Sequence, residues 1–207
     1  MVKKFSLGMP DFVTIRTEEK ELITTFENGQ AALDDVVIRM ETTEEQVNAY
    51  VKADESPVKT IALRWKKEAP KGAKILGDEW ERGYGLMEWK TLRGGRPMPW
   101  YFHVSTENKE YGYGVKVRPS AMCFWLMDPK GITLVMDVRC GGQGVILKGR
   151  ELLAAEVVAM ETTELTSFEA AKTFVALCVQ ILFSRNFQYT EAITGIMHMV
   201  KVQKKKS

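Results

Sequence analysis

Cysteine and histidine are scarce in this chain of 207 residues, which contains three of the first and two of the second. Cys123, Cys140 and Cys178 lie in apolar or glycine-rich stretches, without the paired spacing of a metal site. We therefore expect buried free thiols. Since His103 and His198 are the only histidines, a histidine-rich metal site is not expected, and nothing in the sequence calls for a cofactor.

The sequence also lacks an excess of either charge and any long apolar run. With 29 basic and 27 acidic residues, the net charge of +2 provides no general attraction to nucleic acid or to an anionic membrane. Residues 1–10 have no apolar stretch long enough for a signal peptide, and no other segment could span a bilayer. We therefore expect a cytoplasmic protein that binds neither nucleic acid nor membranes.

What the sequence does contain is β-strand pattern. Short runs that alternate apolar and polar residues, with turn signals between them, predict strands at 12–16, 36–40 and 60–66. Segment 43–52 is ambiguous, because Thr43 could cap a short helix, with a strand that ends in a charged loop as the alternative.

The β pattern continues through the middle of the chain. Segment 87–92 reads as a strand and 94–99 as a loop, and further apolar-rich runs follow at 111–117, 121–127, 133–138, 144–147 and 151–158. This spacing suits an antiparallel meander, and there is no room for the helices that parallel strands require. The prediction is a mostly β chain, an antiparallel β-sandwich over 1–165, followed by a helix over 166–177 that Thr166 or Ser167 caps.

Residues 77–85 carry aromatic rings, carboxylates and an arginine, and Trp89, Trp100 and Tyr101 follow closely. Aromatic rings can stack on the apolar face of a sugar ring, while carboxylates and guanidinium groups bind its hydroxyls. The same residue types also build ordinary sheet surfaces.

An alternative role for the tryptophans is structural, since tryptophan is highly buried on average. In that case Arg82 pairs with a nearby carboxylate, and four tryptophans fill the sandwich core: Trp80, Trp89, Trp100 and Trp125. The acidic residues are more often strand-end or ion-pair residues than catalytic groups; those considered are Asp78, Glu79, Glu81, Asp128 and Asp137.

Seven short motifs between Leu63 and Leu177, in order and at similar intervals, resemble the amino-terminal supersandwich-like β-domain of bacterial α-galactosidase-like (melibiase) glycoside hydrolases. The motifs are Leu76-Gly-Asp-Glu-Trp-Glu-Arg-Gly-Tyr-Gly, Glu88-Trp-Lys, Met98-Pro-Trp-Tyr-Phe, Gly112-Tyr-Gly-Val-Lys, Cys123-Phe-Trp, Asp137-Val-Arg-Cys-Gly-Gly and Gly144-Val-Ile-Leu-Lys-Gly-Arg.

The resemblance implies that catalysis belongs to a second domain that follows the sandwich. In that family a (β/α)8 barrel follows the sandwich and carries both catalytic aspartates of a retaining mechanism. A barrel needs about 250 residues, so we expect this chain to be a fragment truncated before the barrel, with no catalytic residue and no metal. Sandwich loops can lie near a barrel mouth, and the resemblance makes an α-galactoside the expected ligand. The candidate rim residues are Asp78, Trp80, Arg82 and Tyr84, then Glu81 and Trp100.

Residues 178–207 depart from the family pattern. A back-translation of this stretch, read from the third base of each codon, can spell the family's Cys-Pro-Asn-Pro-like segment and its first barrel strand. One hypothesis is therefore that the reading frame shifts near Cys178, so that 178–207 is an out-of-frame tail. The alternative is a genuine carboxy-terminal helix that continues through residues 181–183.

Three functions follow from these observations. The first is a non-catalytic fragment of an α-galactosidase-like hydrolase. The second is an independent carbohydrate-binding module. The third is an assembly or interaction domain that forms a homo-oligomer or associates through an exposed barrel-docking face.

Overall fold

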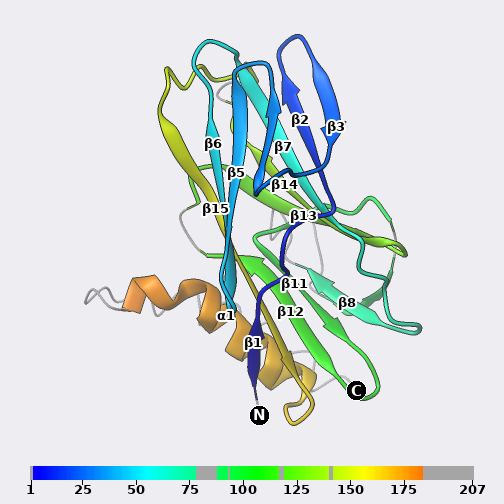
Figure 1. Cartoon of the computed structure of the whole chain (residues 1–207). Coiled ribbons are helices and arrows are strands. Elements are labelled where there is room, and N and C mark those ends of the chain that lie inside the picture. The colour runs from blue at the N-terminus through cyan, green and yellow to red at the C-terminus, as the bar shows by residue number, and fades with distance from the viewer. Residues whose placement is uncertain (1, 78–87, 93, 117–118, 140–141, 184–207) are drawn as a thin grey trace.

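The computed structural model describes residues 2–77, 88–92, 94–116, 119–139 and 142–183. These residues form two antiparallel sheets and one helix at the carboxy-terminal end of the described chain (Figure 1). The predicted mostly β, antiparallel sandwich with a following helix is confirmed. In the described part of the chain, no helix is long and apolar enough to cross a bilayer.

The larger sheet is organised around the long strand β15 (Glu151–Thr162). This strand pairs with β6 (Gln46–Lys52) on one edge and β12 (Glu110–Val115) on the other, and β1 (Lys3–Phe5) pairs with its last residues. In sheet order the strands are β4 (Gln30–Leu33), β5 (Val36–Thr42), β6 (Gln46–Lys52), β15 (Glu151–Thr162), β12 (Glu110–Val115), β11 (Tyr101–Ser105), β8 (Lys74–Gly77) and β9 (Lys90–Thr91).

The smaller sheet has six described strands and lies against the larger one. In sheet order they are β10 (Met98–Pro99), β13 (Met122–Asp128), β14 (Gly131–Asp137), β7 (Val58–Trp65), β2 (Phe12–Thr17) and β3 (Glu21–Thr24). Because side chains alternate along a strand, every second residue faces the other sheet, as Ile61 and Leu63 of β7 do. Burial of this alternating set forms the main core.

Aromatic rings link the two sheets. Trp125 of β13 and Phe102 of β11 are fully buried, and their rings meet edge to face at 5.6 Å. Trp65 lies 6.1 Å from Trp125, and its indole N–H donates to the Gly8 carbonyl. Trp125 therefore lies in the core, as expected if the tryptophans have a structural role.

Helix α1 (Ser167–Phe183) covers part of the outer face of the larger sheet (Figure 1). Thr166 caps it: its hydroxyl accepts from the Glu169 N–H at 3.3 Å, and the Glu169 carboxylate accepts from the Thr166 N–H at 3.0 Å. This reciprocal pair is a capping box. The predicted start of the helix is confirmed, and the helix runs past its predicted end at Leu177 to Phe183.

Two glycines of β12 make room for α1. A side chain at Gly112 would overlap the Phe174 ring, and a Cβ at Gly114 would lie 2.9 Å from the Cys178 Sγ. Glu110 lies on the same face of β12, because residues two apart share a face. The Gly112-Tyr-Gly motif therefore has a packing role: the missing side chains of its two glycines leave a channel on the sheet surface, and the Phe174 ring fills it.

The structure corrects some predicted elements. The helical interpretation of 43–52 is wrong: Val47, Ala49 and Val51 are fully buried at strand spacing, and β6 pairs with strands on both edges. Segment 144–147 forms no strand. Its single bridge joins Val145 to Val58 at the start of β7. The pairing of β14 with β7 stops at Thr60, so this end of the strand is free for the bridge.

Two further segments differ in extent. Of the predicted strand 87–92, only Lys90–Thr91 pair within the described residues, as β9. The predicted loop 94–99 ends in the two-residue strand β10, whose Met98 faces Trp125 in the register. Cys123 and Cys178 are buried free thiols as predicted, and Cys140 lies outside the described residues.

Candidate functional site

Most of the candidate sugar-site rim lies in segment 78–87, outside the described residues. Those positions are Asp78, Trp80, Glu81, Arg82 and Tyr84. The remaining candidate, Trp100, is described. Its geometry sets it apart from the other tryptophans of the described chain.

Trp100 is the corner at which the chain crosses from one sheet to the other, between β10 and β11. Its N–H donates to the Cys123 carbonyl at 3.3 Å. Its carbonyl accepts from the Val115 N–H at 3.0 Å and from the Trp125 indole N–H at 3.2 Å. The corner is thus fixed by hydrogen bonds to strands of both sheets.

The backbone of Trp100 is strained. Its φ is 61°, in the left-handed region that glycine adopts freely and that bulky residues rarely occupy. Such a conformation costs on the order of 1–3 kcal/mol. Because glycine would make the same turn without strain, the turn alone does not explain the presence of an indole.

Trp100 is 47% exposed, and among the aromatic residues whose burial the structure describes it is the one that is largely open to solvent. Trp100 is therefore not a core residue, and the alternative in which it fills the sandwich core is wrong. Met122, the residue before its acceptor Cys123, is 54% exposed. The corner therefore presents an indole to solvent on a rigid backbone.

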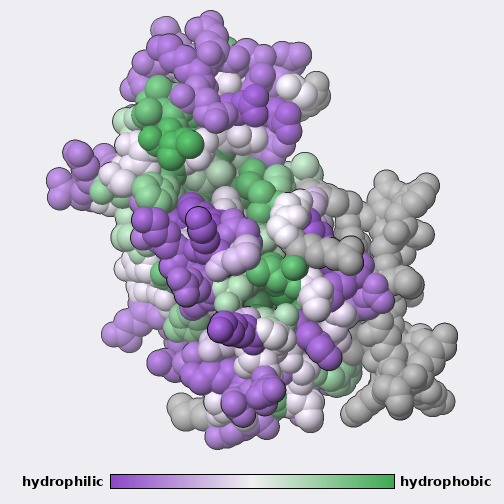
Figure 2. All heavy atoms as spheres, turned by 90° about the vertical axis from the view of Figure 1, so that its right-hand side faces the viewer, coloured by the Kyte–Doolittle hydropathy of each residue, from purple (hydrophilic) through white to green (hydrophobic). Residues whose placement is uncertain are grey.

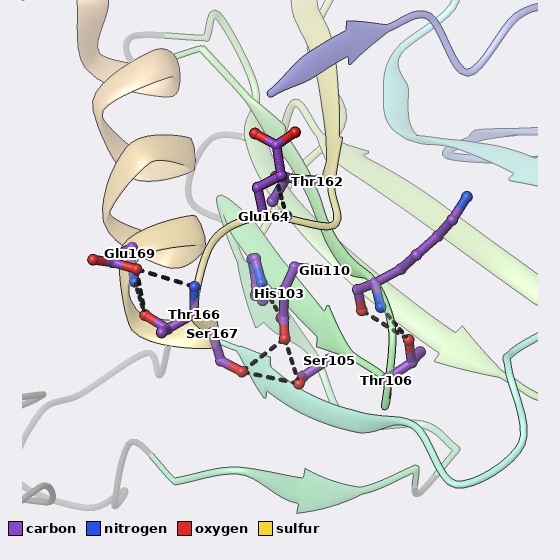
Figure 3. A network of polar contacts seen from close by, with 10 residues as sticks. His103, Ser105, Thr106, Glu110, Thr162, Glu164, Thr166, Ser167 and Glu169 are labelled. Carbon is purple, nitrogen blue, oxygen red and sulfur yellow. Dashed lines mark hydrogen bonds and ion pairs between the residues drawn. The ribbon is translucent and has the colours of Figure 1, made fainter. Parts of the chain in front are cut away.

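A second arrangement is a buried polar network below α1 (Figure 3). The Glu110 carboxylate lies at its centre: it accepts from the Ser105 hydroxyl at 2.8 Å and from the Ser167 hydroxyl at 2.7 Å, and contacts His103 Nε2 at 2.9 Å. The two serine oxygens are 3.0 Å apart. The network joins β11, β12 and the first turn of α1.

The electrostatics favour an ionised Glu110. Burial acts to raise the pKa of this carboxyl, but hydrogen bonds from His103, Ser167 and Ser105 outweigh it, so the pKa is lowered from its ordinary value. Nε2 of His103 must then be a donor. Nδ1 of this fully buried ring has no hydrogen-bond partner among the described residues, and the Trp89 ring lies edge-on to it, 5.6 Å away.

This network does not have the order of a nucleophilic site. In such a site a histidine takes the proton of the hydroxyl and a carboxylate orients the histidine. Here both Ser105 and Ser167 donate directly to Glu110, and His103 is fully buried. The geometry therefore supports attachment of α1 to the sheet rather than acyl transfer.

Asp128 and Asp137 are strand-end, ion-paired residues. Asp128 lies 2.8 Å from the Arg64 guanidinium, and Asp137 pairs with Arg139. These arginine hydrogen bonds lower the pKa of each carboxyl, which makes both poor general acids at neutral pH. Asp78, Glu79 and Glu81 lie outside the described residues.

Sequence reasoning did not identify the network. His103 was considered only as a metal ligand and Ser167 only as a helix cap, while Glu110 was not selected. The available signal was the period-two pattern of β12, in which a glutamate shares a face with Gly112 and Gly114. Its partners depend on cross-strand register, which the sequence does not specify.

No group of three or more histidine, cysteine, aspartate or glutamate residues in the described chain is arranged to hold a metal ion. No protein-family model matches this sequence, and no curated protein matches it either.

Proposed function

We propose that this chain is the amino-terminal sandwich of an α-galactosidase-like glycoside hydrolase, and that it contributes to sugar binding rather than to bond cleavage. The observation that carries the proposal is Trp100, an exposed indole on a strained and hydrogen-bonded corner. Strained residues cluster at functional sites, and the corner does not require this side chain. The order of the seven motifs supplies the family and the sugar class.

The physical case for a sugar is stacking. An indole face packs against the C–H groups of a pyranose, and a main chain already fixed by hydrogen bonds before binding loses little conformational entropy. In this proposal Trp100 is the apolar face of the rim. The hydrogen-bonding groups come from the rim segment, with Asp78, Glu81 and Arg82 on the hydroxyls and Trp80 and Tyr84 as further aromatic contacts.

The proposal assigns no catalytic residue to the chain. Three carboxylates of the described sandwich, Glu110, Asp128 and Asp137, already accept hydrogen bonds from neighbouring side chains. We expect the purified chain to release no product from an aryl α-galactoside. Turnover that a single carboxylate substitution abolishes would contradict this assignment.

The free thiols of Cys123 and Cys178 fit a reducing compartment, and we propose a cytoplasmic location.

Calorimetric titration with galactose, melibiose and raffinose tests the binding role. The wild-type chain should bind at least one of these sugars saturably, and Trp100→Ala should weaken binding by about tenfold, which corresponds to about 1.4 kcal/mol. Ile23→Ala is the matched control, since Ile23 is 66% exposed on the edge strand β3. Absence of saturable heat, or equal affinity in Trp100→Ala, would contradict the proposal.

An assembly role is the second candidate, favoured by the outer face of the six-stranded sheet. Phe124, Val135, Ala62, Thr14 and Ile23 are neighbours in register across five strands. All five are at least partly exposed. Figure 2 shows the side of the molecule on which β3 and β13 lie in Figure 1, with hydrophobic patches between hydrophilic areas.

Size-exclusion chromatography separates the two candidates. If this face mediates self-association, the elution volume should fall with rising protein concentration, and Val135→Lys should restore the monomer because a lysine cannot be buried unpaired. A wild-type monomer at every concentration excludes the assembly role. It leaves the sugar-binding proposal intact.

A further inference from the structure

Helix α1 is attached to the sandwich by a small set of contacts that the main core does not share. Its buried residues Ala170, Phe174, Val175 and Cys178 pack with Tyr101, Val158 and Met160 as a separate cluster on the outer face of the larger sheet. The main core between the sheets contains no residue of α1. The core is therefore complete without the helix.

The helix also satisfies its own amino-terminal end. The capping box between Thr166 and Glu169 uses no group of the sheet. An α1 detached from the sheet would keep these hydrogen bonds, so detachment does not require the helix to unfold at its first turn. Elements with few buried contacts are the ones that open locally in folded proteins.

Ser167, in the first turn of α1, makes polar contacts with the sheet. Ser167 donates to the buried Glu110 carboxylate at 2.7 Å, and its oxygen lies 3.0 Å from that of Ser105 (Figure 3). Hydrogen bonds to a buried charged group are stronger than those between neutral groups. Detachment of α1 breaks this contact and leaves Glu110 with fewer donors.

We propose that α1 undocks from the larger sheet as one unit while both sheets stay folded, and that the Glu110–Ser167 contact is the latch that holds it. The undocked state bares the channel at Gly112 and Gly114, which pair in the sheet with Met160 and Tyr101 and which the Phe174 ring fills in the docked state. This inference does not depend on the proposed sugar-binding role.

The cysteines provide the reporter. Cys178, which α1 packs against the larger sheet, is 5% exposed, whereas Cys123 is 1% exposed in the main core. Burial raises the pKa of each thiol to about 12. Undocking frees Cys178 alone, while global unfolding frees both. Alkylation of the native chain with iodoacetamide, followed by peptide mass spectrometry, measures each rate separately from that of Cys140.

In the wild type, Cys178 should react at least about tenfold faster than Cys123, a difference of about 1.4 kcal/mol in opening free energy. Ser167→Ala should increase the Cys178 rate by about a further fivefold and leave Cys123 unchanged, because it removes the latch but keeps the capping box. Ser167→Thr retains the hydroxyl and should behave as wild type. Thr106→Ala is the control, since within the described chain the Thr106 hydroxyl bonds Lys109 of its own hairpin.

Equal alkylation rates for Cys178 and Cys123 in the wild type would overturn the proposal, since both thiols would then open only with the whole fold. An unchanged ratio in Ser167→Ala would overturn the latch. The wild-type ratio decides the first part even if the variant does not fold.

Discussion

At the scale of single residues, the proposed sugar binding depends on Trp100. Its indole is exposed, its φ is positive, and three hydrogen bonds fix its main chain. Trp100 is a rim candidate in the sequence because it follows an aromatic-rich block and lies in a motif that resembles the hydrolase family. The left-handed corner could not be predicted, since it arises where strands of two different sheets meet.

The strain at Trp100 is measurable. Trp100→Gly and Trp100→Ala remove the same indole, but only glycine adopts a positive φ freely. The free energy of unfolding should therefore be about 1 kcal/mol higher for the glycine variant than for the alanine variant. Urea denaturation of the two variants gives this difference. Equal stabilities, or a more stable alanine variant, would show that the corner is unstrained.

Gly112 makes a second prediction at this scale. A methyl group there meets the Phe174 ring, so Gly112→Ala should destabilise the protein by about 2 kcal/mol, the usual cost of overpacking. In a Phe174→Ala background the same change should cost less than about 0.5 kcal/mol, because the two residues are coupled. Gly94→Ala, with no atom near the new methyl, is the control. Additive effects of the two substitutions would contradict this packing.

At the scale of secondary-structure elements, strands with clear alternation were predictable from the sequence. Phe12–Thr17 and Val58–Trp65 are examples, because their period-two pattern matches a sandwich with one buried face. Segment 43–52 misled because Val47, Tyr50 and Val51 also fit a helical face. Tertiary pairing on both edges of β6 decided in favour of the strand.

The attachment of α1 should depend on pH through Glu110. Its pKa is lower in the folded protein than the ordinary 4.5, so its contribution to stability is complete above that value and is lost as pH falls through the folded-state pKa. The stability difference between wild type and Glu110→Gln should therefore be largest near neutral pH and shrink in acid. Urea titrations at a series of pH values measure it.

Glu107→Gln is the control for this pH dependence, since Glu107 is exposed on the turn of the same hairpin. Its stability difference from wild type should stay near zero. A Glu110→Gln difference that is constant with pH would mean that Glu110 gains nothing from its charge in the folded state.

At the scale of the whole molecule, the sandwich and its helix followed from composition and periodicity, because both set the fold class. The candidate site followed only in part. The buried network of Glu110 depends on which strands become neighbours, and the sugar class comes from the order of short motifs rather than from the described geometry. We propose that this sandwich binds sugar through the exposed indole of Trp100.

The most direct test follows the indole N–H signals of the five tryptophans by ¹⁵N-edited NMR during a melibiose titration. The account predicts a saturable shift of the Trp100 signal, assigned by Trp100→Phe, while the buried Trp65 and Trp125 respond much less. A titration in which no indole signal shifts saturably, or in which the Trp100 signal alone stays fixed, would contradict the account.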